Sequence, residues 1–164
     1  MTTAPAGDLV RAKIPDEHHA SAPMTRPLLV GEDNPYGTDP RFALFPLPKN
    51  SAGWRLCHVV LGMTPREYLG SFDRANLCSE KWSWPEARSN ARILSAKYDA
   101  IVLLGKKVAK AFSFEKIPEP FYLIDVDRPY YVFLPHPSGR CRTWNEPGAI
   151  DRARGVMRAA GIRP

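Results

Sequence analysis

The stretch Ala100-Ile101-Val102-Leu103-Leu104-Gly105 decides the fold that we expect for this chain. It is a run of five apolar residues that a glycine ends. A short continuous apolar run of this kind is typical of a strand that is buried on both faces. Such strands occur in parallel sheets that helices cover on both sides. The stretch therefore predicts a strand inside a parallel α/β sheet.

Segments of similar character lie on both sides of this run. Apolar stretches predict further strands at 28–30, 75–78, 121–124 and 130–134, of which 75–78 has the weakest pattern. Helical spacing and capping residues predict helices at 54–63, from 65 onward, at 84–97, at 105–112 and at 146–160. Strands that alternate with helices are typical of a three-layer α/β/α domain whose central sheet is mainly parallel.

Three of the expected helix starts depend on particular capping residues. Thr64-Pro65-Arg66-Glu67 and Ser83-Trp84-Pro85-Glu86 both have the capping-box pattern, in which a hydroxyl group and a glutamate pair with the first N–H groups of a helix. Asn145 is the expected cap of the last helix, which Gly161 should end.

The length and charge of the chain limit its organisation and its partners. Its 164 residues suffice for one domain with a full core. We expect this domain at 27–164, because residues 1–26 are small, polar and proline-rich, as in a flexible arm. His18 and His19 lie in this arm without a second cluster of ligands, so we expect solvated side chains there rather than a metal site. The net charge of 23 − 17 = +6 favours a polyanionic partner.

The cysteines and the apolar runs indicate the compartment. Cys57, Cys78 and Cys141 form no C-x-x-C pair, which argues against a zinc or iron–sulfur site and suits reduced thiols. No apolar run approaches the roughly 18 residues of a membrane span, and the N-terminus lacks the apolar segment of a signal peptide. We therefore expect a cytoplasmic protein with no membrane segment and no metal, and we take it to be a monomer.

Two loops stand where the working site of a parallel α/β sheet is expected, beyond the carboxyl ends of its strands. The first is Gly31–Gly37, after the first strand. Its carboxylates, Glu32 and Asp33, could orient or deprotonate a water molecule, whereas Asn34 could only orient one. The same residue types also form ordinary turns, so a purely structural role is the alternative.

The second loop is Pro135–Arg142, after the last strand. His136 could donate a hydrogen bond to charge that develops on a leaving group. Ser138, Arg140 and Arg142 are suited to phosphate groups. The alternative is a proline-rich turn with solvated arginines.

Together the two loops resemble the signature motifs of the uracil-DNA glycosylase superfamily. Its first motif reads G-Q-D-P-Y-H in the main uracil branch and G-I-N-P-G in the mismatch-specific branch. The corresponding residues of this chain are Gly31-Glu32-Asp33-Asn34-Pro35-Tyr36-Gly37, a blend of the two with one additional residue. Its second motif reads H-P-S-P-L-S or N-P-S-G-L-S-R; here it is His136-Pro137-Ser138-Gly139-Arg140-Cys141-Arg142. The run A-I-V-L-L-G-K-K-V-A at 100–109 is similar to the superfamily's central strand and helix, so the resemblance spans about residues 27–160.

The resemblance implies a sheet of four parallel strands between helices, and excision of uracil or a related modified pyrimidine that is flipped out of DNA. His136 would stabilise the departing base. The residue that handles the attacking water is Asp33 if the motif is aligned from Gly31. It is Asn34 if the motif is aligned from Pro35, which keeps the proline and Tyr36 in phase. No metal or nucleotide cofactor is implied.

The resemblance also implies how the base and the DNA are held. Phe45, or Phe42 in its place, would stack on the flipped base, Asn76 would read its pairing edge, and Tyr36 would close one side of the pocket. Arg140 would fill the hole left in the DNA, while Ser138 and Arg142 would meet phosphates. Simpler interpretations are a core phenylalanine, a turn asparagine and solvated arginines.

Two other functions suit the same residues. One is a binding module that keeps the pocket but has lost turnover. The other is a small-molecule hydrolase or transferase that acts on free nucleosides.

Overall fold

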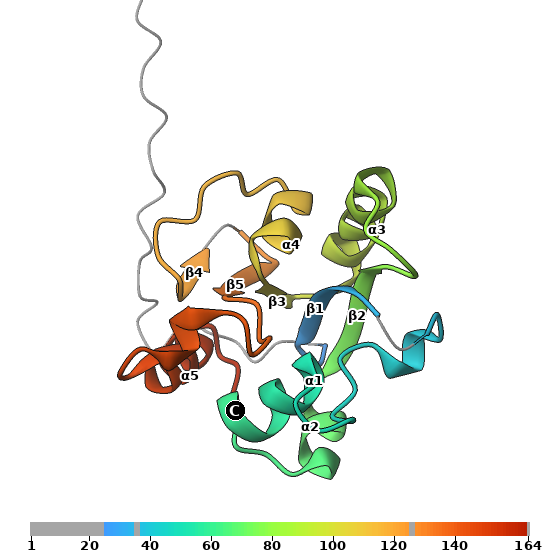
Figure 1. Ribbon diagram of the computed structural model, residues 1–164. Coiled ribbons are helices and arrows are strands. Elements are labelled where there is room, and N and C mark those ends of the chain that lie inside the picture. Colours follow the sequence, from blue (N-terminus) through green and yellow to red (C-terminus); the bar gives the residue numbers. More distant parts are fainter. Residues whose placement is uncertain (1–24, 35–36, 125–126, 164) are drawn as a thin grey trace, which may run out of the picture.

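The structure is a computed structural model that describes residues 25–34, 37–124 and 127–163. Figure 1 shows a central sheet with helices packed around it. Most of the expected N-terminal arm, with His18 and His19, lies outside the described residues. Tyr36 lies outside them as well.

Five strands form the sheet, in the order β2-β1-β3-β5-β4. The strands are β1 (Leu28–Asp33), β2 (Asp73–Cys78), β3 (Ala100–Leu104), β4 (Tyr122–Ile124) and β5 (Tyr130–Leu134). The pairs β1–β2, β1–β3 and β3–β5 are parallel, and β4 pairs antiparallel with β5. The predicted α/β class and mainly parallel sheet are therefore confirmed.

The expected number of four strands, which the resemblance implied, is wrong. The additional strand is β4, a three-residue strand at the edge of the sheet. Only residues 125–129 separate β4 from β5. A parallel crossover needs a dozen or more residues, whereas an antiparallel pair can be joined by a short loop. The short connection therefore makes β4 an antiparallel neighbour of β5.

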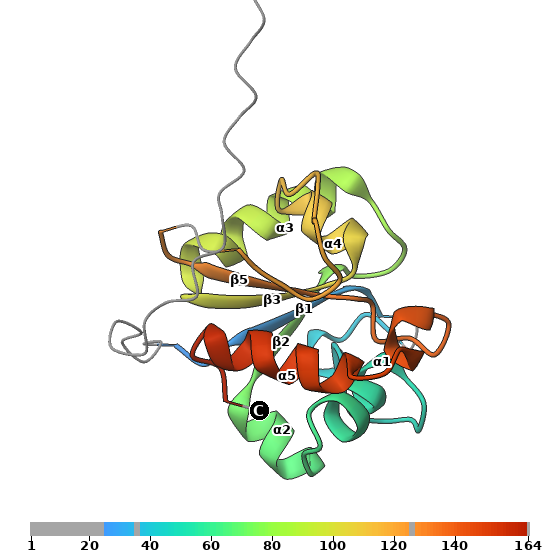
Figure 2. The same ribbon diagram turned by 90° about the vertical axis from the view of Figure 1, so that its left-hand side faces the viewer.

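Helices cover both faces of the sheet, as Figure 2 shows. On one face lie α3 (Trp84–Lys97) and α4 (Lys106–Ala111). On the other lie α1 (Ala52–Trp54), the π-helical segment η2 (Arg55–Val60) that continues it, α2 (Pro65–Ser71) and α5 (Ala149–Ala159). Two short 3-10 segments, η1 (Pro40–Phe42) and η3 (Arg142–Asn145), complete the described elements.

The alternation of side chains along β3 produces two apolar cores. Val102 and Leu104 pack with the α1, α2 and α5 side, while Ile101 and Leu103 pack with α3 and α4. All five residues of β3 are fully buried. The sheet thus needs apolar residues at consecutive positions, which is why the run appears continuous in the sequence.

One of the two predicted capping boxes is confirmed and the other is wrong. Thr64 and Glu67 exchange hydrogen bonds at the start of α2. Ser83 precedes α3 but caps no N–H group with its side chain. The Glu86 carboxylate instead accepts hydrogen bonds from the N–H and hydroxyl groups of Ser79, at 3.0 and 3.2 Å.

The predicted start of the last helix at Asn145 is also wrong. Asn145 ends η3, and α5 begins only after Gly148. Pro147 explains the delay, because a proline disfavours helical backbone at the residue before it. Glu146 accordingly has an extended backbone, with ψ of 141°.

In the described part of the chain, no helix combines the length and apolar character needed to span a membrane.

All three cysteines are free thiols, and burial raises the pKa of Cys57 and of Cys78.

Candidate functional site

A pocket of about 670 Å³ opens at the carboxyl end of β1, on the side of the sheet that carries α1. Four segments line it: the end of β1, part of the stretch 42–53, the middle of β2, and the loop 136–140 that follows β5. Polar groups at the end of β1, on β2 and in the loop after β5 thus face one cavity, and apolar side chains from the stretch 42–53 form part of its wall. Such cavities are where small molecules and bases are usually bound.

Most residues that the sequence singled out line this pocket, namely Asp33, Asn34, Phe42, Phe45, Asn76, His136, Ser138 and Arg140. Arg142 is exposed as the first residue of η3 and does not line the pocket. Glu32 does not line it either. The structure therefore gathers residues from separate parts of the sequence, while their roles stay predictions.

The end of β1 differs from the predicted loop, because the strand continues to Asp33 instead of ending at Gly31. Side chains of a strand point alternately to its two faces, which separates Asp33 from its neighbour Glu32. Asp33 reaches the pocket, whereas the half-buried Glu32 forms an ion pair with Lys107 at 3.7 Å. Of the two carboxylates considered for the water, only Asp33 is therefore placed for it, together with Asn34.

Asn76 reaches the pocket because its neighbour on β1 has no side chain. Gly31 and Asn76 are paired across the two strands. A methyl group on Gly31 would lie only 2.5 Å from Oδ1 of Asn76 and 3.1 Å from Leu44. Glycine at position 31 thus leaves the space that the Asn76 amide occupies. An asparagine that only formed a turn would not need this space.

The loop after β5 fixes the proton of His136. The backbone N–H of Ser138 donates a hydrogen bond to Nδ1 of His136 at 3.2 Å. A ring nitrogen that accepts a hydrogen bond carries no proton, so the neutral imidazole carries its proton on Nε2. His136 can therefore act as a hydrogen-bond donor through Nε2 without being charged.

Side chains from outside the loop hold its backbone. Nε1 of Trp144 donates a hydrogen bond to the carbonyl oxygen of His136 at 2.9 Å. Nε of Arg55 donates one to the carbonyl oxygen of Pro137 at 3.0 Å. Arg55 was not singled out from the sequence, because it is 82 positions away from its partner. The sequence offered one indication of its position: the helical pattern places Arg55 one turn after Ser51, which lines the pocket.

The end of β3 also limits the space around His136. Gly105 has a positive φ of 99°, a conformation that side chains disfavour. A methyl group there would lie 3.3 Å from Cβ of His136. The glycine that ends the central apolar run thus allows β3 and the His136 loop to pack closely.

Hydrogen bonds and a cation fix the aromatic wall of the pocket. The rings of Phe42 and Phe45 meet edge to face, with centroids 5.4 Å apart. Arg74 lies over the Phe45 ring at 5.7 Å and donates a hydrogen bond to Ala43 O at 2.9 Å. Burial lowers the pKa of Arg74. Phe45 is only half-buried beside the pocket, so its interpretation as a core residue is wrong.

Tyr68 holds the same wall from beneath. Its hydroxyl group donates a hydrogen bond to the carbonyl oxygen of Leu44 at 2.9 Å. Burial raises the pKa of Tyr68 far above its usual range, so the hydroxyl group stays protonated and keeps donating.

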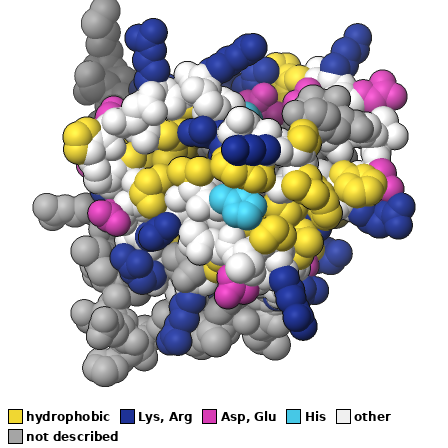
Figure 3. Space-filling view, turned by 60° about the horizontal axis from the view of Figure 1, so that its bottom comes forward, with side chains coloured by type: hydrophobic (Ala, Val, Ile, Leu, Met, Phe, Trp, Pro, Cys, Tyr) yellow, Lys and Arg dark blue, Asp and Glu magenta, His cyan; other side chains and the backbone are white. Residues whose placement is uncertain are grey.

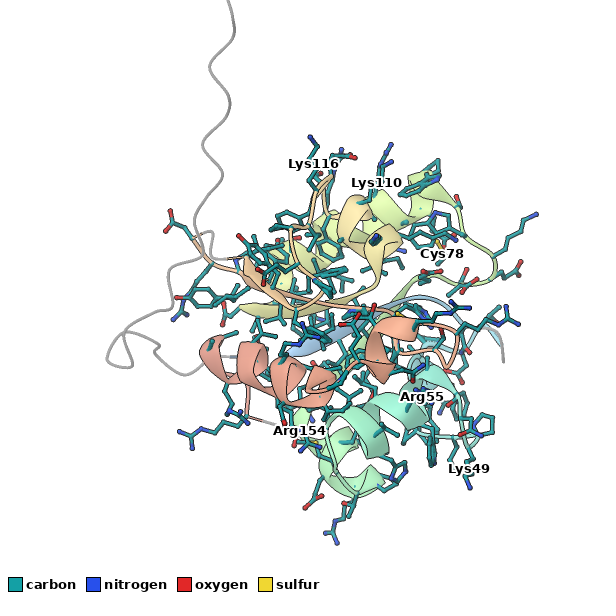
Figure 4. All side chains as sticks on the ribbon, turned by 60° about the vertical axis from the view of Figure 1, so that its left-hand side comes forward. Lys49, Arg55, Cys78, Lys110, Lys116 and Arg154 are labelled. Carbon is teal, nitrogen blue, oxygen red and sulfur yellow. The ribbon has the colours of Figure 1, made fainter. Side chains whose placement is uncertain are left out.

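Basic side chains lie at and near the pocket, among which Arg140 lines it. Figure 4 shows Lys49 and Arg55 on the same side of the molecule. Lys49 and Arg140 are exposed, and Arg55 is half-buried. Within the described ranges, no group of three or more histidine, cysteine, aspartate or glutamate side chains could hold a metal ion.

No protein-family model matches this chain, and no curated protein matches it either.

Proposed function

We propose that the protein is a DNA N-glycosylase that removes uracil or a related modified pyrimidine from DNA and leaves an abasic site. One observation carries the proposal. The same pocket contains Asp33 at the end of β1, Asn34 directly after it, and the imidazole of His136, whose Nδ1 accepts a hydrogen bond so that Nε2 is left as the donor. The resemblance of the two loops to glycosylase motifs and the net charge of +6 support it further.

Breaking an N-glycosidic bond creates opposite charges at its two ends. The electron pair of the bond between C1′ and the base nitrogen moves into the base, and the sugar becomes electron-poor. Nε2–H of His136 donates a hydrogen bond to the base carbonyl oxygen where the negative charge gathers. The departing base is thereby stabilised without a proton being transferred to it.

The sugar then forms a bond to the oxygen of a water molecule. If Asp33 handles this water, its carboxylate accepts the proton that the water loses. If Asn34 does so, its amide orients the water and the proton passes to solvent. The base leaves as an anion and takes up a proton from solvent, so the products are the free base and a sugar with a hydroxyl group at C1′.

The aromatic wall and Asn76 would hold the flipped base. The half-buried Phe45 ring offers a face for stacking, and its position is fixed by Arg74. Asn76 offers both an amide donor and an acceptor to the edge of a pyrimidine. Ser138, Arg140 and Arg142 would meet the DNA outside the pocket.

The proposal is tested with a panel of oligonucleotides that each carry one modified base, followed by alkaline cleavage of abasic sites. We expect one or more pyrimidine substrates to be cleaved and the free base to be recovered. His136→Ala is the control that separates this activity from a contaminating enzyme. Tight binding without base release would instead indicate a binding module, and release only from free nucleosides would indicate a small-molecule enzyme.

A further inference from the structure

The helix that forms part of the pocket wall carries two aromatic side chains that reach the surface, the half-buried Trp54 and the exposed His58. Ala52 and Gly53 line the pocket, and the next residue, Trp54, lies beside His58 one turn further along. Residues four positions apart lie on the same side of a helix. The two ring centroids are 5.0 Å apart, and the planes are inclined by 41°. We call this pair the Trp54–His58 platform.

Exposed apolar side chains lie both at the pocket and on the helix that carries the platform. Phe42 and Leu47 line the pocket and are 51% and 60% exposed. Val59, next to His58, is 39% exposed. Figure 3 shows a face of the molecule on which hydrophobic side chains lie beside a histidine, with lysine and arginine side chains around this face. Exposed apolar side chains that gather in this way usually mark a binding surface.

The charges around the platform favour a nucleic acid as its occupant. Lys49 precedes the helix, Arg55 lies within it, and Arg140 lines the pocket. Basic groups beside exposed aromatic rings are the combination that binds the backbone and the bases of single strands.

The platform further distinguishes an unpaired strand from a duplex. Bases within a duplex are stacked on both faces, so an aromatic side chain on a protein surface can stack only on a base that has left the helix. We propose that the strand whose base enters the pocket continues unpaired across the Trp54–His58 platform. The substrate is then single-stranded on at least one side of the target base. This inference rests on the proposed function for the base in the pocket.

The test measures the affinity for an oligothymidylate of about ten nucleotides, within the usual site size of such surfaces. This probe contains no modified base, so its binding does not depend on excision. We expect Trp54→Ala to weaken binding by about fivefold to a hundredfold, because stacking contributes that much per base. Trp54→Phe keeps an aromatic ring and should retain most of the affinity. His58→Ala should weaken binding by a smaller factor.

A matched control removes an exposed apolar side chain elsewhere. Ile93 lies on α3, on the opposite face of the sheet, and is 61% exposed. Ile93→Ala should bind the oligothymidylate like the unmodified protein. Thermal unfolding of each variant separates a loss of binding from a loss of folded protein.

Three results would overturn the inference. The first is equal binding by the unmodified protein and Trp54→Ala, and the second is an equal loss on blunt duplex and single strand. The third is a change of sedimentation on Trp54→Ala with unchanged binding, which would make the platform a contact between two copies of the chain. The abasic-site assay tests the proposed function separately, since the panel can fail while the platform still binds.

Discussion

The two strand ends that meet at the pocket hold their side chains in different ways. Asp33 at the end of β1 is fixed by the sheet, where it pairs with Cys78 of β2. His136 lies beyond the end of β5, and hydrogen bonds from Arg55 and Trp144 hold its loop. Substitution of a side chain leaves the register of a sheet in place. Variants at Asp33 should therefore remove chemistry alone, whereas the position of His136 can be disturbed from outside the pocket.

The largest effect is expected at the end of β1. If Asp33 accepts the proton of the water, Asp33→Asn should slow single-turnover excision by about 10²- to 10⁴-fold. If Asn34 orients the water, Asn34→Ala should have the larger effect. Small and equal effects of both variants would mean that this strand end has no chemical role.

The next largest effect is expected at His136. His136→Ala removes a donor to the departing base and should slow single-turnover excision by about 10²-fold or more. DNA affinity, measured by fluorescence anisotropy, should change little, because the donor acts mainly on charge that develops during the reaction. A folded variant with an unchanged excision rate would refute the assignment.

Arg55→Lys tests whether the His136 loop is positioned from outside. Lysine keeps the positive charge but loses the planar Nε–H group that bonds to Pro137. We expect the rate to fall by about fivefold to tenfold, equivalent to about 1 kcal/mol for one hydrogen bond. The pH profile and the melting temperature should stay the same. An equal loss with Arg55→Ala and Arg55→Lys would support positioning, and loss only with alanine would indicate that the charge alone matters.

The smallest effects are expected from the exposed arginines of the second loop. Arg140→Ala should reduce excision from duplex DNA more than from single strands, because only a duplex has a hole to fill. Arg142→Ala should weaken binding to both forms and lower the salt slope by about one unit. Small, equal losses for both variants on both substrates would identify two solvated side chains.

Elements with a clear local signal, a continuous apolar run or a helix start with proline and glutamate in its first turn, were predictable from the sequence. The bounds of β3, β5 and α3 agree with the predicted ranges. The end of β1 was missed because Glu32 and Asp33 are polar, although their backbone still belongs to the strand. An apolar pattern indicates burial. Where a strand leaves the core and enters a polar site, the apolar pattern ends although the strand's backbone hydrogen bonds continue.

The pocket itself was predictable only in part. The rule for strand ends correctly places Asp33, Asn34 and His136 at one edge. The contact of Arg55 with Pro137, and the space that Gly31 leaves for Asn76, join residues far apart in the chain. Local pattern contains no information about such pairs. Glu86 shows the same limit. Its spacing from Ser83 predicted a hydrogen bond at the start of α3, but its carboxylate accepts one from Ser79 instead.

The brevity of β4 has a consequence for how the protein behaves at high concentration. The outermost strand of a sheet presents unpaired N–H and C=O groups, to which another chain can add a strand. β2 forms one edge of this sheet and β4 the other; β4 has only three residues, Tyr122–Ile124, and runs antiparallel to its neighbour. A template this short offers few hydrogen bonds to an incoming chain. We therefore expect this edge to resist sheet-to-sheet aggregation, and insertion of residues that lengthen β4 should increase light scattering in concentrated solutions.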